Sequence, residues 1–80
     1  MIIDLILDRK DGKEYNAKRF YNDIMICYCS FPDIALPIAD ALDSGKEEDV
    51  KRELKKYIKE QGYNSNIVEY INSVDWLPVE

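Results

Sequence analysis

Apolar residues recur at helical spacing through most of the chain, most clearly over residues 44–62. There Val50, Leu54, Tyr57 and Ile58 fall on one face at about 100° per residue. Acidic side chains begin the segment and basic side chains end it, which suits the helix dipole. Ser44 and Glu47 have the spacing of a capping box, and Gly62 stands where a left-handed C-cap is expected. The pattern predicts a long amphipathic helix over residues 46–61.

Two helices are predicted before this one. The first follows Asn16, a favourable N-cap, and runs to about Cys29, with Tyr15 and Phe20 spaced as a hydrophobic staple. The second covers residues 34–43, with Asp33 as its cap and Pro37 near its start. Their expected buried stripes are Ala17, Phe20, Tyr21, Ile24, Cys27 and Tyr28 in the first, and Ile34, Ile38, Ala41 and Leu42 in the second.

A fourth helix is predicted over residues 65–74, because Tyr63, Asn64 and Val68 repeat the same cap and staple. Its expected buried residues are Ile67, Tyr70, Ile71 and Val74. Pro78 then ends regular structure.

The N-terminal residues 2–8 alternate, with Ile3, Leu5 and Leu7 on one side, and this alternation predicts a strand. The dipeptide Asp11-Gly12 is typical of a hairpin turn. The strand needs a mate, for which residues 13–15, the tail around Trp76 and a second copy of the chain all stay open. The expected fold is therefore mostly α (α+β): one domain over residues 1–80, with about four helices around one small core and an N-terminal strand or short hairpin.

Composition narrows the function classes. Apolar residues make up 46% of the chain, which is typical of a folded protein, and the net charge is −5. An acidic chain is repelled by phosphate backbones and anionic membranes, so a basic protein is the expected partner and nucleic acid is not. No apolar run has the roughly 18–20 residues of a membrane span, and the chain does not start like a secretory signal. A cytoplasmic location is expected.

Candidate chemistry is sparse. There is no histidine, and the only two cysteines, Cys27 and Cys29, lack the C-x-x-C spacing of redox and zinc sites. The sequence contains no P-loop, no G-x-G-x-x-G and no G-x-S-x-G. We therefore expect a protein that is not an enzyme and that holds no cofactor and no metal.

Surface chemistry points to binding instead. The densest acidic cluster consists of Asp40, Asp43, Glu47, Glu48 and Asp49. This cluster could imitate a phosphate backbone and bind a basic partner, with an apolar patch of Ile26, Trp76 and Leu77 as its anchor. Helix capping explains much of the acidity equally well, and Trp76 could instead close the core.

The alternative is a small nucleic-acid-binding regulator that uses the basic face of the long helix. This face comprises Lys51, Arg52, Lys55, Lys56 and Lys59. The helix pair around Ser44 and Gly45 also has the order of a helix-turn-helix, but Glu47 and Glu48 at the reading end would repel DNA. A purely structural subunit, including a homodimer, is a third possibility.

Six stretches carry a family resemblance: residues 3–12 (IDLILDRKDG), 15–16 (YN), 20–21 (FY), 47–51 (EEDVK), 63–64 (YN) and 73–77 (SVDWL). In these stretches the chain resembles small, mostly uncharacterised proteins of bacterial mobile genetic elements. The resemblance covers both ends of the chain and is weakest over residues 26–37. It implies a host-interaction role, such as inhibition of a defence nuclease of the anti-CRISPR or anti-restriction type, and it carries no functional residues to transfer.

Overall fold

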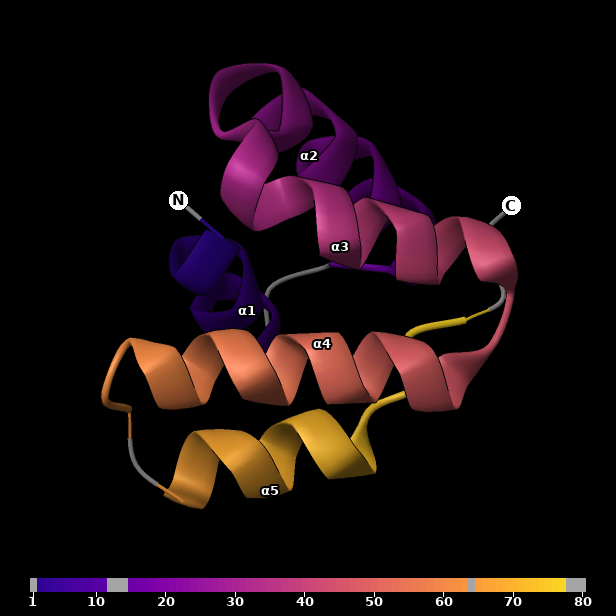
Figure 1. Cartoon of the computed structure of the whole chain (residues 1–80). Helices are drawn as coiled ribbons and strands as arrows, with labels where there is room; N and C mark the ends of the chain where they lie inside the picture. The colour runs from indigo at the N-terminus through magenta and orange to yellow at the C-terminus, as the bar shows by residue number, and fades with distance from the viewer. Residues whose placement is uncertain (1, 12–14, 64, 78–80) are drawn as a thin grey trace.

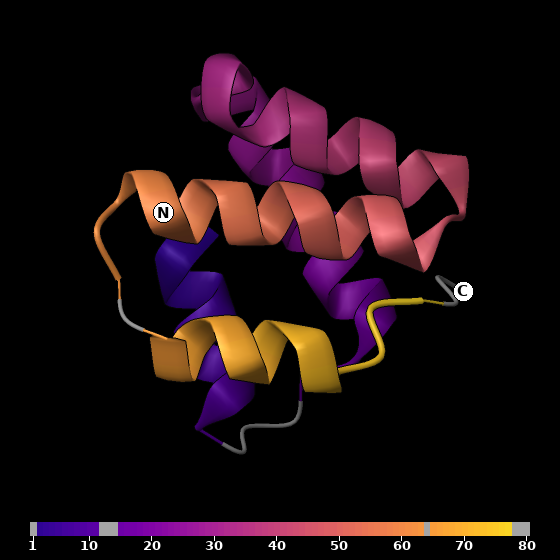
Figure 2. The same cartoon turned by 60° about the horizontal axis from the view of Figure 1, so that its bottom comes forward.

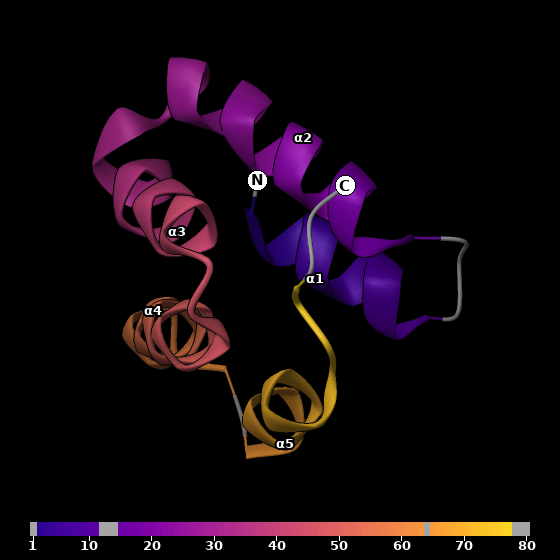
Figure 3. The same cartoon turned by 90° about the vertical axis from the view of Figure 1, so that its right-hand side faces the viewer.

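The computed structural model describes residues 2–11, 15–63 and 65–77, and these residues form five α-helices. The helices are α1 (Ile2–Lys10), α2 (Ala17–Ser30), α3 (Pro32–Ser44), α4 (Glu47–Glu60) and α5 (Ser65–Ser73). α4 lies between α3 and α5 (Figures 1 and 2). Seen from the end, these three helices line one side of the molecule and α1 and α2 the other (Figure 3). The mostly helical prediction is confirmed, and the count of four helices is wrong.

The prediction of an N-terminal strand is wrong. The segment forms a helix, α1, in addition to the four predicted helices, and none of the described residues lies in a strand. Ile2, Ile3 and Ile6 are buried, and their spacing is that of one helical face. In a short run with so many apolar residues, alternation and helical periodicity are both satisfied, so the pattern could not separate them. Residues 12–14, where the hairpin turn and most of its return were predicted, lie outside the described residues.

α2 begins as predicted. The Asn16 side chain accepts a hydrogen bond from the backbone N–H of Arg19 at 2.8 Å. The rings of Tyr15 and Phe20 meet edge to face with centroids 6.2 Å apart, which confirms the staple. Phe20 and Ile24 are fully buried, but Tyr28 is exposed because the last turn of α2 extends beyond the core.

α3 starts two residues earlier than predicted, and Phe31, not Asp33, is its N-cap. Pro37 lies inside the helix, although proline removes one helical hydrogen bond there. Ile34 is 37% exposed, so the prediction that it belongs to the buried stripe is wrong. The residues of α3 that are buried are Ala35, Ile38, Ala39, Ala41 and Leu42.

The predicted capping box of α4 does not form. Ser44 is the last residue of α3, so it does not stand at the N-cap of α4. That position is held by Lys46, whose side chain makes no capping hydrogen bond. The Ser44 hydroxyl donates to the carbonyl of Ala41 at 2.7 Å instead. The carboxylate of Glu47 accepts from the backbone N–H of Trp76 at 3.0 Å, a contact between segments far apart in sequence.

The other end of α4 is as predicted. Gly62 has a φ of 77°, in the left-handed region that favours glycine. The backbone N–H of Tyr63 donates to Ile58 and that of Gly62 to Lys59, both at 3.1 Å, which is the Schellman pattern. The predicted apolar face of Val50, Leu54, Tyr57 and Ile58 is buried.

α5 ends one residue before the predicted end. Ile67 and Ile71 are buried as expected, while Tyr70 and Val74 pack against the core only in part. The predicted cap, Asn64, lies outside the described residues.

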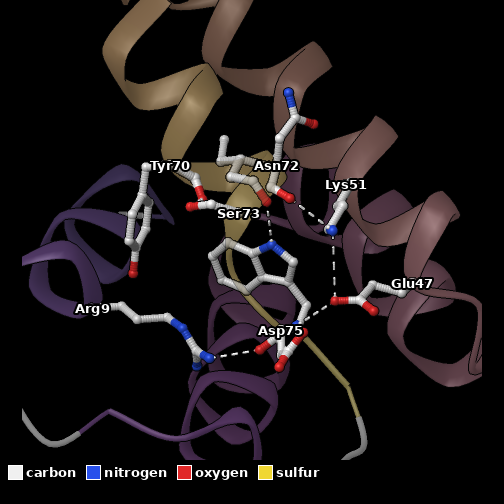
Figure 4. Close-up of polar contacts among 9 residues, drawn as sticks. Arg9, Glu47, Lys51, Tyr70, Asn72, Ser73 and Asp75 are labelled. Carbon is white, nitrogen blue, oxygen red and sulfur yellow. Dashed lines mark hydrogen bonds and ion pairs between the residues drawn. The ribbon is translucent and has the colours of Figure 1, made fainter.

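Trp76 is fully buried and completes the core after α5. Its ring lies 4.7 Å from that of Phe20, and its Nε1–H donates to the carbonyl of Ile71 at 2.9 Å. Arg9 and Glu47 approach the tail from opposite sides (Figure 4). The interpretation of Trp76 as an exposed interface anchor is therefore wrong, because the small core needs this side chain for its own closure.

The two predicted caps should respond differently to alanine. Asn16→Ala should lower the free energy of unfolding by about 1 kcal/mol, because the Arg19 N–H loses its acceptor. Ser44→Ala should lower the free energy of unfolding by only a few tenths of a kcal/mol, because Ser44 does not cap α4. Urea denaturation followed by circular dichroism compares the two, and equal losses would contradict the cap assignment.

Candidate docking groove between α3 and α4

A groove runs between α3 and α4, formed by two hollows that share Pro37 and Glu53. Both helices lie in the foreground of Figure 1. The hollow toward the start of α4 contains Asp40 and Asp49, and the one toward its end contains Asp33 and Glu60. The groove therefore extends along most of α3 and α4.

Carboxylates dominate the lining of the groove. Asp33, Asp40, Asp49, Glu53 and Glu60 line it, against two cations, Arg52 and Lys56. The Arg52 guanidinium lies 3.0 Å from the Asp49 carboxylate and 3.8 Å from that of Glu53, so it is already paired. The groove has a net negative charge that these internal contacts do not cancel.

The groove also exposes apolar surface. Ile34 and Leu36 on α3 are 37% and 40% exposed. At one end lies a small apolar hollow lined by Ile2, Phe31, Ile34 and Tyr57, and the last two of these residues also line the groove. Half-exposed Phe31 stands at this hollow, so a neighbouring molecule could reach it.

Tyr57 brings a polar atom to this end of the groove. Its hydroxyl is buried and makes no hydrogen bond of normal geometry with a described residue, although the Ile3 backbone lies close to it. Burial raises the pKa of Tyr57 above its ordinary value of 10.0, at which the hydroxyl is already protonated at neutral pH. It is an unused donor at the place where the apolar hollow meets the groove.

The predicted acidic cluster is not one surface. Asp40 and Asp49 line the groove, but Asp43 accepts a hydrogen bond from the Tyr21 hydroxyl at 2.6 Å. Glu47 holds the Trp76 N–H and lies 3.8 Å from the Lys51 ammonium. Glu48 is exposed and lines neither hollow of the groove. Asp43 and Glu47 therefore have structural roles.

The predicted apolar residues are not one surface either. Ile26 is 67% exposed on α2 and does not line the groove, whereas Leu77 is partly buried against the core beside Trp76. Of the predicted basic residues, Lys51 donates to the carbonyl of Asn72 at 2.9 Å. The other four, Arg52, Lys55, Lys56 and Lys59, line a hollow between α4 and α5.

Three groove carboxylates were missed in the sequence: Asp33, Glu53 and Glu60. Their spacing was visible, since Asp33 and Asp40 are seven residues apart and Glu53 follows Asp49 by four. Such spacing keeps side chains on one edge of a helix. It becomes a groove only when two helices are placed side by side, which the sequence did not show.

No metal-binding arrangement accompanies the groove in the part of the chain that the structure describes. No group of three or more histidine, cysteine, aspartate or glutamate residues is placed to hold a metal ion there. Within the same residues no helix has the length and apolarity needed to cross a bilayer. Comparison with protein-family models, curated proteins and solved structures gives no match.

Proposed function

We propose that this chain is a non-enzymatic protein-interaction module that binds a basic amphipathic helix of a partner protein in the α3–α4 groove. One observation carries the proposal: five carboxylates against two cations line a groove that also exposes Ile34 and Leu36. Helix-in-groove recognition uses an apolar stripe flanked by charges, and the charges here call for lysine and arginine on the partner.

The contacts follow from the lining. Lysines or arginines of the partner helix would pair with Asp40 and Glu53 on opposite walls. Its apolar stripe would cover Ile34 and Leu36, and one large side chain would enter the hollow beside Phe31.

The partner class that fits is a protein whose basic surface binds nucleic acid. Occupying that surface would block the nucleic acid, so the proposal includes inhibition of a nucleic-acid-processing complex, the role that the resemblance to mobile-element proteins implies. Because Asp33, Asp40 and Glu60 of the groove are exposed, association should be fast at low salt and slower at high salt.

Neutralising the groove tests the proposal. The probe is a fluorescein-labelled amphipathic peptide of about 14 residues, four helical turns, with leucine on one face and lysine and arginine on the other. Its fluorescence anisotropy is titrated with the wild-type chain and with a variant that carries Asp40→Asn, Glu53→Gln and Glu60→Gln. We expect the variant to bind about tenfold more weakly, which is about 1.4 kcal/mol.

A matched control removes the same charge from the rest of the surface. Its three substitutions are at exposed residues outside the groove: Asp11→Asn, Glu48→Gln and Glu69→Gln. The control should bind within about twofold of wild type, because these side chains do not reach the groove. Equal weakening of both variants would mean that net charge, and not the groove, attracts the peptide.

A further inference from the structure

A second groove, between α4 and α5, carries the opposite charge. α4 contributes Arg52, Lys55, Lys56 and Lys59 to it, and the loop and α5 contribute Tyr63 and Val68. None of the described residues that line it is acidic. Four cations within the eight residues 52–59 of α4 form a row about 10 Å long. A row of this length spans two or three successive phosphates of a nucleic-acid strand.

The lysines of this row are available. Lys55, Lys56 and Lys59 make no ion pair or side-chain hydrogen bond with any described residue, whereas Arg52 is held by Asp49 at 3.0 Å. In contrast, Lys51 on the same helix is engaged by Asn72 and Glu47. Lys55 and Lys59 line only the α4–α5 groove of the two, whereas Lys56 lies between the two grooves and lines both.

Tyr63 adds an aromatic surface to the row of lysines. Its side chain is 43% exposed, although its backbone N–H is fixed to Ile58 by the Schellman turn at Gly62. An exposed ring beside a cationic row is the combination that binds single-stranded nucleic acid, since every base can stack on it. An acidic peptide would use the lysines and gain nothing comparable from the ring.

We propose that the α4–α5 groove binds single-stranded nucleic acid, with the lysines on the phosphates and Tyr63 stacked on a base. The net charge of −5 opposes this only at long range, because salt screens charges beyond about 8 Å at physiological ionic strength. With two or three phosphates neutralised, the logarithm of the affinity should fall with the logarithm of the salt concentration with a slope of about −1.5 to −2.

The test uses a fluorescein-labelled thymidine oligonucleotide of about 12 nucleotides, titrated at several salt concentrations. Lys55→Gln, Lys56→Gln and Lys59→Gln together should weaken binding by about tenfold or more and flatten the salt slope. Tyr63→Leu should weaken binding about fivefold or more without changing that slope. Circular dichroism checks that each variant keeps its helices.

The matched control removes the same charge at exposed lysines outside the groove: Lys10→Gln, Lys18→Gln and Lys46→Gln. It should bind within about twofold of wild type. The proposal is overturned if this control loses as much affinity as the groove variant, or if the wild-type chain does not bind the oligonucleotide. It is also overturned if polyglutamate competes as well as the oligonucleotide and Tyr63→Leu has no effect. None of these outcomes depends on the α3–α4 groove binding a peptide.

Discussion

Replacing Trp76 with alanine is expected to lower the free energy of unfolding by about 3–5 kcal/mol. The ring is fully buried and packs on Phe20, and its Nε1–H bond to Ile71 would also be lost. A chain of 80 residues has a total stability of about 4–12 kcal/mol, so this loss should remove at least about a quarter of it and lower the urea midpoint strongly.

Urea denaturation followed by far-ultraviolet circular dichroism measures this loss. Ile26→Ala is the control, because Ile26 is 67% exposed and its truncation should change the stability by no more than about 0.5 kcal/mol. Trp76→Phe should fall between the two, since it keeps an aromatic ring on Phe20 and loses the bond to Ile71. A Trp76→Ala variant as stable as Ile26→Ala would show that the tail does not close the core.

Arg9→Gln is expected to cost about 2–4 kcal/mol. The guanidinium donates to the carbonyl of Tyr15 at 3.0 Å and to that of Asp75 at 2.7 Å, and it lies 5.0 Å from the centre of the Trp76 ring. Hydrogen bonds to a charged group contribute about 1.5–3 kcal/mol each, and a cation–π contact adds about 0.5–1 kcal/mol. These contributions overlap, so the total is less than their sum.

Lys10→Gln is the matched control for this variant, because it removes the same charge from the next residue, which is exposed. The same urea titration should place Lys10→Gln within about 0.5 kcal/mol of wild type. Comparable losses at the two positions would mean that Arg9 contributes only its charge, and not its bonds between α1 and the tail.

Long amphipathic segments could be predicted because two observations agreed in each. In α4 the predicted apolar periodicity and the Gly62 cap are both confirmed. At the start of α2 the Asn16 cap and the staple between Tyr15 and Phe20 are confirmed as well. The prediction for the start of α4 was wrong, because the spacing of Ser44 and Glu47 is the same whether the serine caps the second helix or ends the first. In the structure the connection between the two helices consists only of residues 45–46, and Ser44 belongs to α3.

The acidic character of the candidate site could be predicted from the sequence, but the set of residues that form it could not. Acidity around Asp40 and Asp49 was recognised, but Asp43 and Glu47 are used by Tyr21 and Trp76. Those contacts join residues 22 and 29 positions apart, so no local pattern could show them. Likewise, the sequence could not show whether Trp76 is buried in the core or exposed at an interface, because this depends on how the helices pack.

Mapping a bound basic peptide on the chain shows whether the α3–α4 groove is its binding site. Nitrogen–proton correlation spectra of the labelled chain are recorded while the unlabelled amphipathic peptide is added to saturation. We expect the shifted amides to cluster along the α3–α4 groove, around Asp40, Glu53 and Ile34. Saturable binding with shifts confined to α1, α2 or the α4–α5 side, or no saturable shifts at all, would contradict this expectation.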